Sequence, residues 1–216
     1  MKKTFMPAAK TEEELRALQL NGLQWTVKHA YNGSPFYKSL LTDAGLRPED
    51  IRSLDDLENL PFTTSQNLQE GYPFPLLSVP FEKVVRIHAS SGTTGKRKVL
   101  CYTQKDIADW THFFARCYEM AQLDPEDRVQ IAVGYGVWTA GISFQMGCEA
   151  YGAMAIPAGP GNLDMQCEFL IDFQTTVMCC TASMGLLMAE EVNRRGIKKK
   201  INLKKMIFGS ERSSDA

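Results

Sequence analysis

The alternation of strand-like and helix-like segments beyond Pro80 constrains the fold of this chain more than any other feature. Six short runs of strand-forming residues recur there, at residues 84–89, 99–103, 129–133, 154–156, 177–181 and 205–208. Helix-compatible segments separate most of the later runs, at residues 104–122, 139–151, 163–173 and 183–195. Strands that alternate with helices at this spacing are typical of right-handed βαβ units, so the sequence predicts an α/β fold with a mainly parallel sheet.

The first eighty residues follow a different pattern. Apolar residues fall near helical spacing between Glu12 and Tyr31, and a second short helix is predicted to end at Gly45. Prolines then interrupt an extended stretch at positions 61, 73, 75 and 80. We therefore predict a helical arm with a proline-rich extended segment over residues 1–80, followed by an α/β nucleotide-binding portion over residues 81–216.

Composition narrows the class of protein. The 216 residues are 44% hydrophobic and 23% charged, with a formal net charge of −1, so no global field attracts nucleic acid or anionic lipid. The longest mainly apolar run, residues 177–189, is too short to span a bilayer, and no secretory signal is recognised at the N-terminus. Six cysteines without a CxxC pattern indicate reduced thiols and no zinc site. We expect a cytoplasmic protein with no nucleic-acid partner, no membrane partner and no metal ligands in this chain.

Residues 90–98, with the sequence SSGTTGKRK, carry the clearest chemical signal. Glycines allow backbone amides to approach an anion, threonines add hydroxyl donors and Lys96 adds a positive charge, a combination suited to a polyphosphate. The segment is not a Walker A loop, because Lys96 is followed by Arg97 in place of Ser or Thr. The alternative is an exposed hairpin turn between the flanking strands, since Gly, Ser and Thr are common in turns.

Three further small-residue loops also follow predicted strands, with the sequences GYGVWTAG, PAGPGN and FGSERSS. In parallel α/β sheets, ligands bind beyond the carboxyl ends of the strands. We therefore expect all four loops to lie at one rim of the sheet and to form one site.

Six motifs occur in the order expected of phenylacetate-CoA ligases: FYKSLLTDAGL, LPFTTSQNLQEGYPF, RIHASSGTTGK, GYGVWTAG, DFQTTVMCCTAS and FGSE. From about Phe36 to its last residue, the chain resembles the N-terminal half of that family, within the adenylate-forming superfamily of acyl-CoA synthetases, adenylation domains and luciferases. The resemblance implies that the α/β portion is part of the family's large domain. It also implies that the family's lid and its catalytic groups lie beyond Ala216, so we assign no catalytic residue to this chain.

The activity that the resemblance implies is ATP-dependent ligation of an aryl-acetic acid to coenzyme A through an acyl-adenylate, with release of AMP and pyrophosphate. Its implied partners are an aryl acid, ATP, CoA and Mg²⁺, with a homodimer as a candidate assembly and phenylacetate catabolism as the setting. Two rivals remain open: an adenylate-forming enzyme whose acceptor is not CoA, and a catalytically inactive nucleotide-binding or interaction fragment.

The resemblance also implies roles for individual residues. Two sets would bind ATP: Ser90, Ser91, Gly92, Thr93, Thr94, Gly95 and Lys96 at the outer phosphates, and Gly209, Ser210 and Glu211 beside adenine. Tyr135, Gly136 and Trp138 would form the aryl pocket. The family usually has Leu-Phe-Thr-Gly-Gly where this chain has Val-Trp-Thr-Ala-Gly, so Trp138 leaves the identity of the acid open. The alternative is that Tyr135 and Trp138 are core aromatic residues near a strand end and do not line a pocket.

Seven cations gather between residues 194 and 205. A site for the 3′-phosphate of CoA or for nucleic acid is one interpretation of this cluster. A solvated helix end followed by a turn is the interpretation that we favour.

Overall fold

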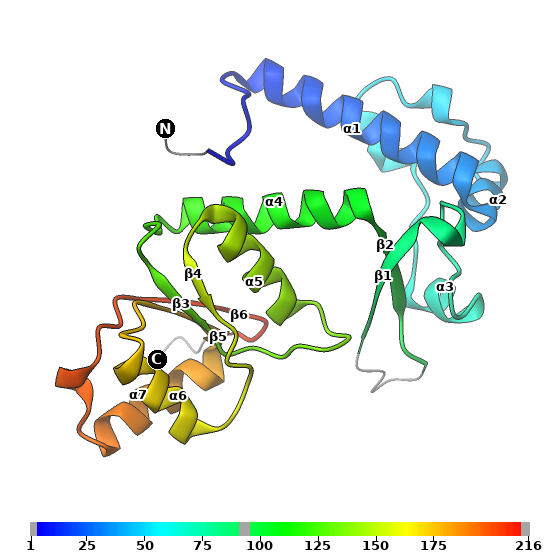
Figure 1. The fold of residues 1–216 in the computed structure, drawn as a ribbon. Helices are drawn as coiled ribbons and strands as arrows, with labels where there is room; N and C mark the ends of the chain where they lie inside the picture. The colour runs from blue at the N-terminus through cyan, green and yellow to red at the C-terminus, as the bar shows by residue number, and fades with distance from the viewer. Residues whose placement is uncertain (1–3, 91–95, 213–216) are drawn as a thin grey trace. The chain divides into compact units, whose positions relative to one another are not determined.

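The chain forms two compact units in the computed structural model, which describes residues 4–90 and 96–212 (Figure 1). Pro7–Lys105 forms one unit, and the chain from Asp106 onward forms the other together with the first residues up to Met6. Contacts therefore divide the chain after Lys105. The predicted domain boundary after residue 80 stays a prediction.

The Pro7–Lys105 unit begins with the predicted helical arm, α1 (Glu12–Gly33) and α2 (Pro35–Asp43). The Thr11 hydroxyl accepts a hydrogen bond from the Glu14 amide at 3.1 Å and so caps α1. Buried Val27, Leu41 and Ile51 form the core of this unit. Short helices follow, namely η1 (Pro48–Asp50), η2 (Asp55–Asn59), α3 (Ser65–Glu70) and η3 (Phe81–Lys83).

An antiparallel hairpin completes this unit. Its strands are β1 (Val84–Ala89) and β2 (Val99–Thr103), which pair only with each other among the described strands. The Ser90 amide donates to the Lys98 carbonyl at 3.0 Å, and the Lys98 amide donates to Ser90 Oγ at 2.9 Å. The expectation that this loop follows a strand of the parallel sheet is therefore wrong. The physical reason is length, because a parallel crossover needs about a dozen residues or more.

The other unit contains the predicted parallel sheet. Its strands are β3 (Arg128–Ile131), β4 (Met154–Ile156), β5 (Val177–Thr181) and β6 (Lys205–Gly209). They are arranged in the order β4-β3-β5-β6, and all three neighbouring pairs are parallel. The α/β fold class with a mainly parallel sheet is confirmed.

Helices cover both faces of this sheet: α4 (Gln104–Met120) and α5 (Ala140–Tyr151) on one face, and α6 (Leu163–Asp172) and α7 (Ala182–Arg194) on the other (Figure 1). Along β5, Val177 and Cys179 belong to the α4–α5 core, whereas Met178 and Cys180 belong to the α6–α7 core. This alternation is the two-residue period of a strand. Since both faces of β5 are buried, its sequence is a nearly continuous apolar run.

Within residues 4–90 and 96–212, no helix combines the length and apolar character needed to cross a membrane.

Candidate functional site

The carboxyl ends of the four parallel strands form one rim of the sheet. Loops leave the rim after β3 (residues 132–139), β4 (residues 157–162) and β6 (from Ser210), and β5 leads directly into α7. The expectation of a shared rim is therefore correct for three of the four small-residue loops. The fourth, residues 90–98, belongs to the hairpin.

A pocket of about 390 Å³ opens at this rim. Its walls are mainly apolar, with two hydroxyl groups from Thr181 and Ser183. The complete lining is Ala132, Val133, Gly134, Trp138, Pro160, Thr181, Ser183, Met184 and Leu187. This combination of apolar walls and a few polar groups is typical of small-molecule sites.

Trp138 is the large aromatic side chain of this pocket, and it is 40% exposed. Its indole packs over Gly134 so closely that a Cβ atom there would lie 3.0 Å from ring carbon Cε3. A side chain at position 134 would therefore push the indole away. Gly136, two residues before Trp138, has φ +86°, a value that glycine adopts without strain. Glycines at both positions thus allow the chain to turn and to place Trp138 at the rim.

Tyr135 lies differently from Trp138. Its ring packs against Gly141 at the start of α5, and it joins the core between α4, α5 and the sheet. The Tyr135 hydroxyl is buried and has no hydrogen-bond partner among the described residues. This burial raises the pKa of Tyr135 to about 12. The geometry fits the core interpretation for Tyr135, and its role in an aryl pocket stays a prediction.

Glu211 is fixed at the N-terminus of α7. Ser210 has φ +71°, uncommon for a non-glycine residue, and this turn follows the end of β6. The Glu211 carboxylate accepts hydrogen bonds from the Ser183 amide at 2.8 Å and from Ser183 Oγ at 3.0 Å. These bonds hold the pKa of Glu211 below its usual value, so the carboxylate stays ionised. A negative charge is also favoured at a helix N-terminus.

Sequence reasoning did not single out Ser183 or Thr181. Thr181 Oγ1 accepts from the Met184 amide at 3.3 Å, which caps α7, and lies 3.2 Å from Ser183 Oγ. Both residues stand where the predicted strand at residues 177–181 ends. The Thr-Ala-Ser sequence directly after that strand was the signal that could have identified them.

The hairpin loop provides two cations with described surroundings. Lys96 Nζ lies 5.3 Å from the centre of the Tyr72 ring, and Lys98 Nζ donates to Ser65 Oγ at 2.9 Å. Ser91, Gly92, Thr93, Thr94 and Gly95 lie outside the described residues. Phosphate binding by Ser90, Lys96 and these five residues stays a prediction.

Several of the cations between residues 194 and 205 are bonded to other groups of this chain. Glu191 accepts from Arg194 Nε at 2.9 Å and from Arg195 Nε at 2.6 Å, which lowers the pKa of Glu191 to about 2. Arg195 also pairs with Asp164. Lys205 Nζ donates to the Ala121 carbonyl at 3.2 Å. These bonds fit a helix end followed by a turn better than a surface for a polyanion.

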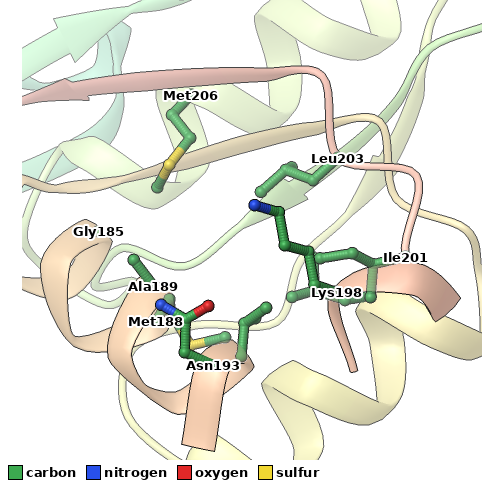
Figure 2. Close-up of a pocket in the computed structure, with 10 residues that line it drawn as sticks. Gly185, Met188, Ala189, Asn193, Lys198, Ile201, Leu203 and Met206 are labelled. Atoms are coloured by element: carbon green, nitrogen blue, oxygen red, sulfur yellow. The ribbon is translucent and has the colours of Figure 1, made fainter. Parts of the chain in front are cut away.

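A second pocket, of about 360 Å³, lies between α7, η4 (Lys198–Lys200) and β6. Figure 2 shows Met188, Leu203 and Met206 around it, with Lys198 as the cation. Leu203 precedes β6 and Met206 is near its start, so this pocket lies away from the carboxyl ends of the strands. We therefore take the rim pocket as the candidate site.

Known proteins similar to this chain are phenylacetate-coenzyme A ligases. The enzyme of Escherichia coli is 43% identical over 201 residues, which are 92% of this chain and 46% of that protein. The enzyme of Aromatoleum evansii is 41% identical, over 93% of this chain and 46% of its own length. The enzyme of Thermus thermophilus is 38% identical, over 98% of this chain and 48% of its own length. The resemblance is therefore confirmed, and the chain spans about half the length of the curated relatives it matches. No family model matches the chain.

Solved structures of similar fold come from 2-hydroxyisobutyryl-CoA ligase. An open conformation in complex with 2-HIB-AMP and CoA has a TM-score of 0.87 and 22% identity, covering 98% of this chain and 53% of that one. The postadenylation state with 2-HIB-AMP has a TM-score of 0.84 and 21% identity, covering 94% of this chain and 47% of that one. At these identities the likeness concerns the fold alone, which this chain shares with about half of that CoA ligase.

Proposed function

We propose that this chain is the N-terminal half of an ATP-dependent ligase that joins an aryl carboxylic acid to coenzyme A. The 43% identity to a phenylacetate-coenzyme A ligase over 92% of the chain carries this proposal. The rim pocket supports it from the geometry, because Trp138 gives an apolar pocket an aromatic wall suited to a small aryl ring.

The reaction has two steps. An oxygen of the acid carboxylate attacks the α-phosphorus of ATP, the bond to pyrophosphate breaks, and an acyl-adenylate forms. The CoA thiol then attacks the acyl carbon and loses its proton, and the bond from that carbon to the AMP oxygen breaks. The solved 2-hydroxyisobutyryl-CoA ligase complex with 2-HIB-AMP and CoA contains an acyl-adenylate, the product of the first step, and the thiol acceptor of the second step.

In this proposal the described residues bind and orient substrates. The rim pocket with Trp138 would hold the acid, and the turn of Gly209, Ser210 and Glu211 would lie beside adenine. Lys96 and its loop would neutralise the charge that develops on the leaving pyrophosphate. Ser183 would keep the Glu211 turn in place through its two hydrogen bonds.

Magnesium is part of the expectation for the whole protein. Among the residues that the structure describes, no group of three or more His, Cys, Asp or Glu side chains could hold a metal ion. The described residues therefore give no assignment of magnesium ligands, and no step above passes through the metal.

The proposal includes a cytoplasmic location, a role in phenylacetate catabolism and a candidate homodimer. Six free cysteines support the location, since reduced thiols are typical of the cytosol.

The test is a product assay with the intact protein of which this chain is half. We expect acyl-CoA and AMP to form only when an acid, ATP and CoA are all present, with phenylacetate, 4-hydroxyphenylacetate and benzoate as the first acids. AMP and pyrophosphate formation that is independent of CoA would favour an adenylate-forming enzyme with another acceptor. No ATP binding by calorimetry would favour a non-catalytic protein.

A further inference from the structure

Three polar side chains form a buried chain of hydrogen bonds beneath the rim. They are Gln130 on β3, Gln166 on α6 and Thr175 before β5, each fully buried. Burial of an amide is costly unless its groups find partners, so such side chains must satisfy one another or the backbone.

Gln166 holds the loop that follows β4. Its Nε2 donates to the Gly159 carbonyl at 2.8 Å and to the Gly161 carbonyl at 3.2 Å. The two glycines have φ +71° and +72°, and the Gly159 amide donates to the Ile131 carbonyl at 2.9 Å. The loop is thus attached on both sides of Pro160.

The other two residues fix the direction of the Gln166 amide. Gln130 Nε2 donates to Gln166 Oε1 at 2.5 Å, and Thr175 Oγ1 donates to Gln130 Oε1 at 2.9 Å. Since carbonyl oxygens only accept hydrogen bonds, the NH₂ group of Gln166 has to face the two glycine carbonyls. Thr175 thus orients the Gln130 amide, and Gln130 in turn orients the Gln166 amide.

Pro160, which lies between the two attached carbonyls, lines the rim pocket together with Trp138. We propose that Gln166 is a positioning residue for the acid pocket: by attaching the loop on both sides of Pro160, it sets which aryl acids fit. This inference rests on the proposed function of the rim pocket.

Two variants separate positioning from plain stability. Gln166→Met keeps a side chain of similar length but removes both bonds to the loop. Thr175→Val is the matched control, because it removes the far end of the same network and leaves the bonds from Gln166 to the loop in place. The free energy of unfolding is measured for both, and we expect both variants to be less stable than the wild type.

The deciding readout is selectivity in the intact protein, measured as the ratio of kcat/KM for phenylacetate to kcat/KM for 3-phenylpropionate. One methylene in an apolar pocket is worth about tenfold or more in kcat/KM. On that scale, we expect Gln166→Met to change this ratio about tenfold. Thr175→Val should change it by less than about twofold. Equal ratios in the wild type and in folded Gln166→Met would overturn the proposal.

Two further measurements keep the outcome decisive. If Gln166→Met does not fold, Pro160→Ala removes the wall directly and must change the same ratio, and an unchanged ratio overturns the proposal. Hydrogen exchange of the amides of residues 158, 159, 161 and 162 reports the attachment itself, and it should be faster in Gln166→Met than in Thr175→Val. A wild type that converts no acid would overturn the proposed function, while the exchange rates would still decide whether Gln166 attaches the loop.

Discussion

Ser183 and Glu211 form one polar cluster although 28 residues separate them in the chain. The amide and the hydroxyl of Ser183 both donate to the Glu211 carboxylate. Glu211 is predicted as a site residue by the resemblance to phenylacetate-CoA ligases, because it stands in the matching motif FGSE. Its partner could not be predicted in the same way, because the contact depends on β5 and β6 being neighbours in the sheet.

Replacing Ser183 with Ala tests this cluster. The variant loses the hydroxyl donor and keeps the backbone donor, so the pKa of Glu211 should rise part of the way toward its usual value. A carboxyl NMR titration of Glu211 measures this pKa. Ser39→Ala, which removes a hydrogen bond to Asp43 in α2, is the control and should leave it unchanged. An unchanged pKa of Glu211 in Ser183→Ala would contradict the assignment.

Glu191 gives a prediction for the dependence of stability on pH. Arg194 and Arg195 lower its pKa from 4.5 to about 2 in the folded chain. Protonation therefore favours the unfolded state: the stabilisation is present above pH 4.5 and is lost as the pH falls toward 2. The difference in free energy of unfolding between the wild type and Glu191→Gln, from urea unfolding, should shrink as the pH falls through this window. A difference that stays constant would show that the two arginines do not stabilise the ionised form.

Trp138 offers the most direct test of the pocket at a single residue. Because its half-exposed ring forms a wall of the pocket, Trp138→Phe should change the order of preference among aryl acids. The KM for ATP should change little, since another loop is proposed to bind the phosphates. Steady-state kinetics with a panel of acids measures both quantities. An equal loss of activity with every acid would instead identify Trp138 as a core residue.

Residues of the Gln130–Gln166–Thr175 network show where prediction from the sequence ends. Glutamine and threonine in apolar surroundings do not reveal their partners, and here the partners are one another's side chains and main-chain carbonyls brought together by the fold. Trp138 was more accessible to prediction, because it stands in GYGVWTAG, one of the motifs that carry the resemblance.

At the scale of elements, the positions of the six strands could be predicted because each is a short β-rich run bounded by turn residues. The pairing of the strands could not, because a local pattern does not specify which strand lies beside which. The order β4-β3-β5-β6 is therefore a result of the structure, and the structure also shows the β1–β2 hairpin that the sequence left as an alternative. The hairpin corrects the expectation that all four loops follow parallel strands.

Strand β6 lies at an edge of the parallel sheet, and Phe208 on it is 54% exposed. Edge strands with exposed apolar side chains pair with other chains. We expect the 216-residue chain to self-associate, and Phe208→Lys to weaken that association by adding a charge to the edge. Sedimentation velocity over a range of concentrations measures it, with Phe62→Lys, an exposed residue of the other unit, as the control. The assignment to β6 fails if Phe208→Lys associates as strongly as the wild type.

At the scale of the whole molecule, this chain is about half as long as the curated relatives it matches. It matches 46% of the length of the phenylacetate-coenzyme A ligase of Escherichia coli. The described residues include those that line the rim pocket, the Glu211 turn and, in the other unit, Lys96 of the hairpin loop. Since the chain spans about half the length of these relatives, we propose that it binds substrates without completing the reaction.

Acid-dependent exchange of pyrophosphate into ATP tests this central claim most directly, with the 216-residue chain and the intact protein compared at equal concentration. The intact protein should exchange pyrophosphate only when an aryl acid is present. The chain alone should be slower by about a hundredfold or more, because loss of one preorganised charge-stabilising group already costs that much. Exchange by the chain alone at a comparable rate would contradict the account, since the catalytic groups would then lie within residues 1–216.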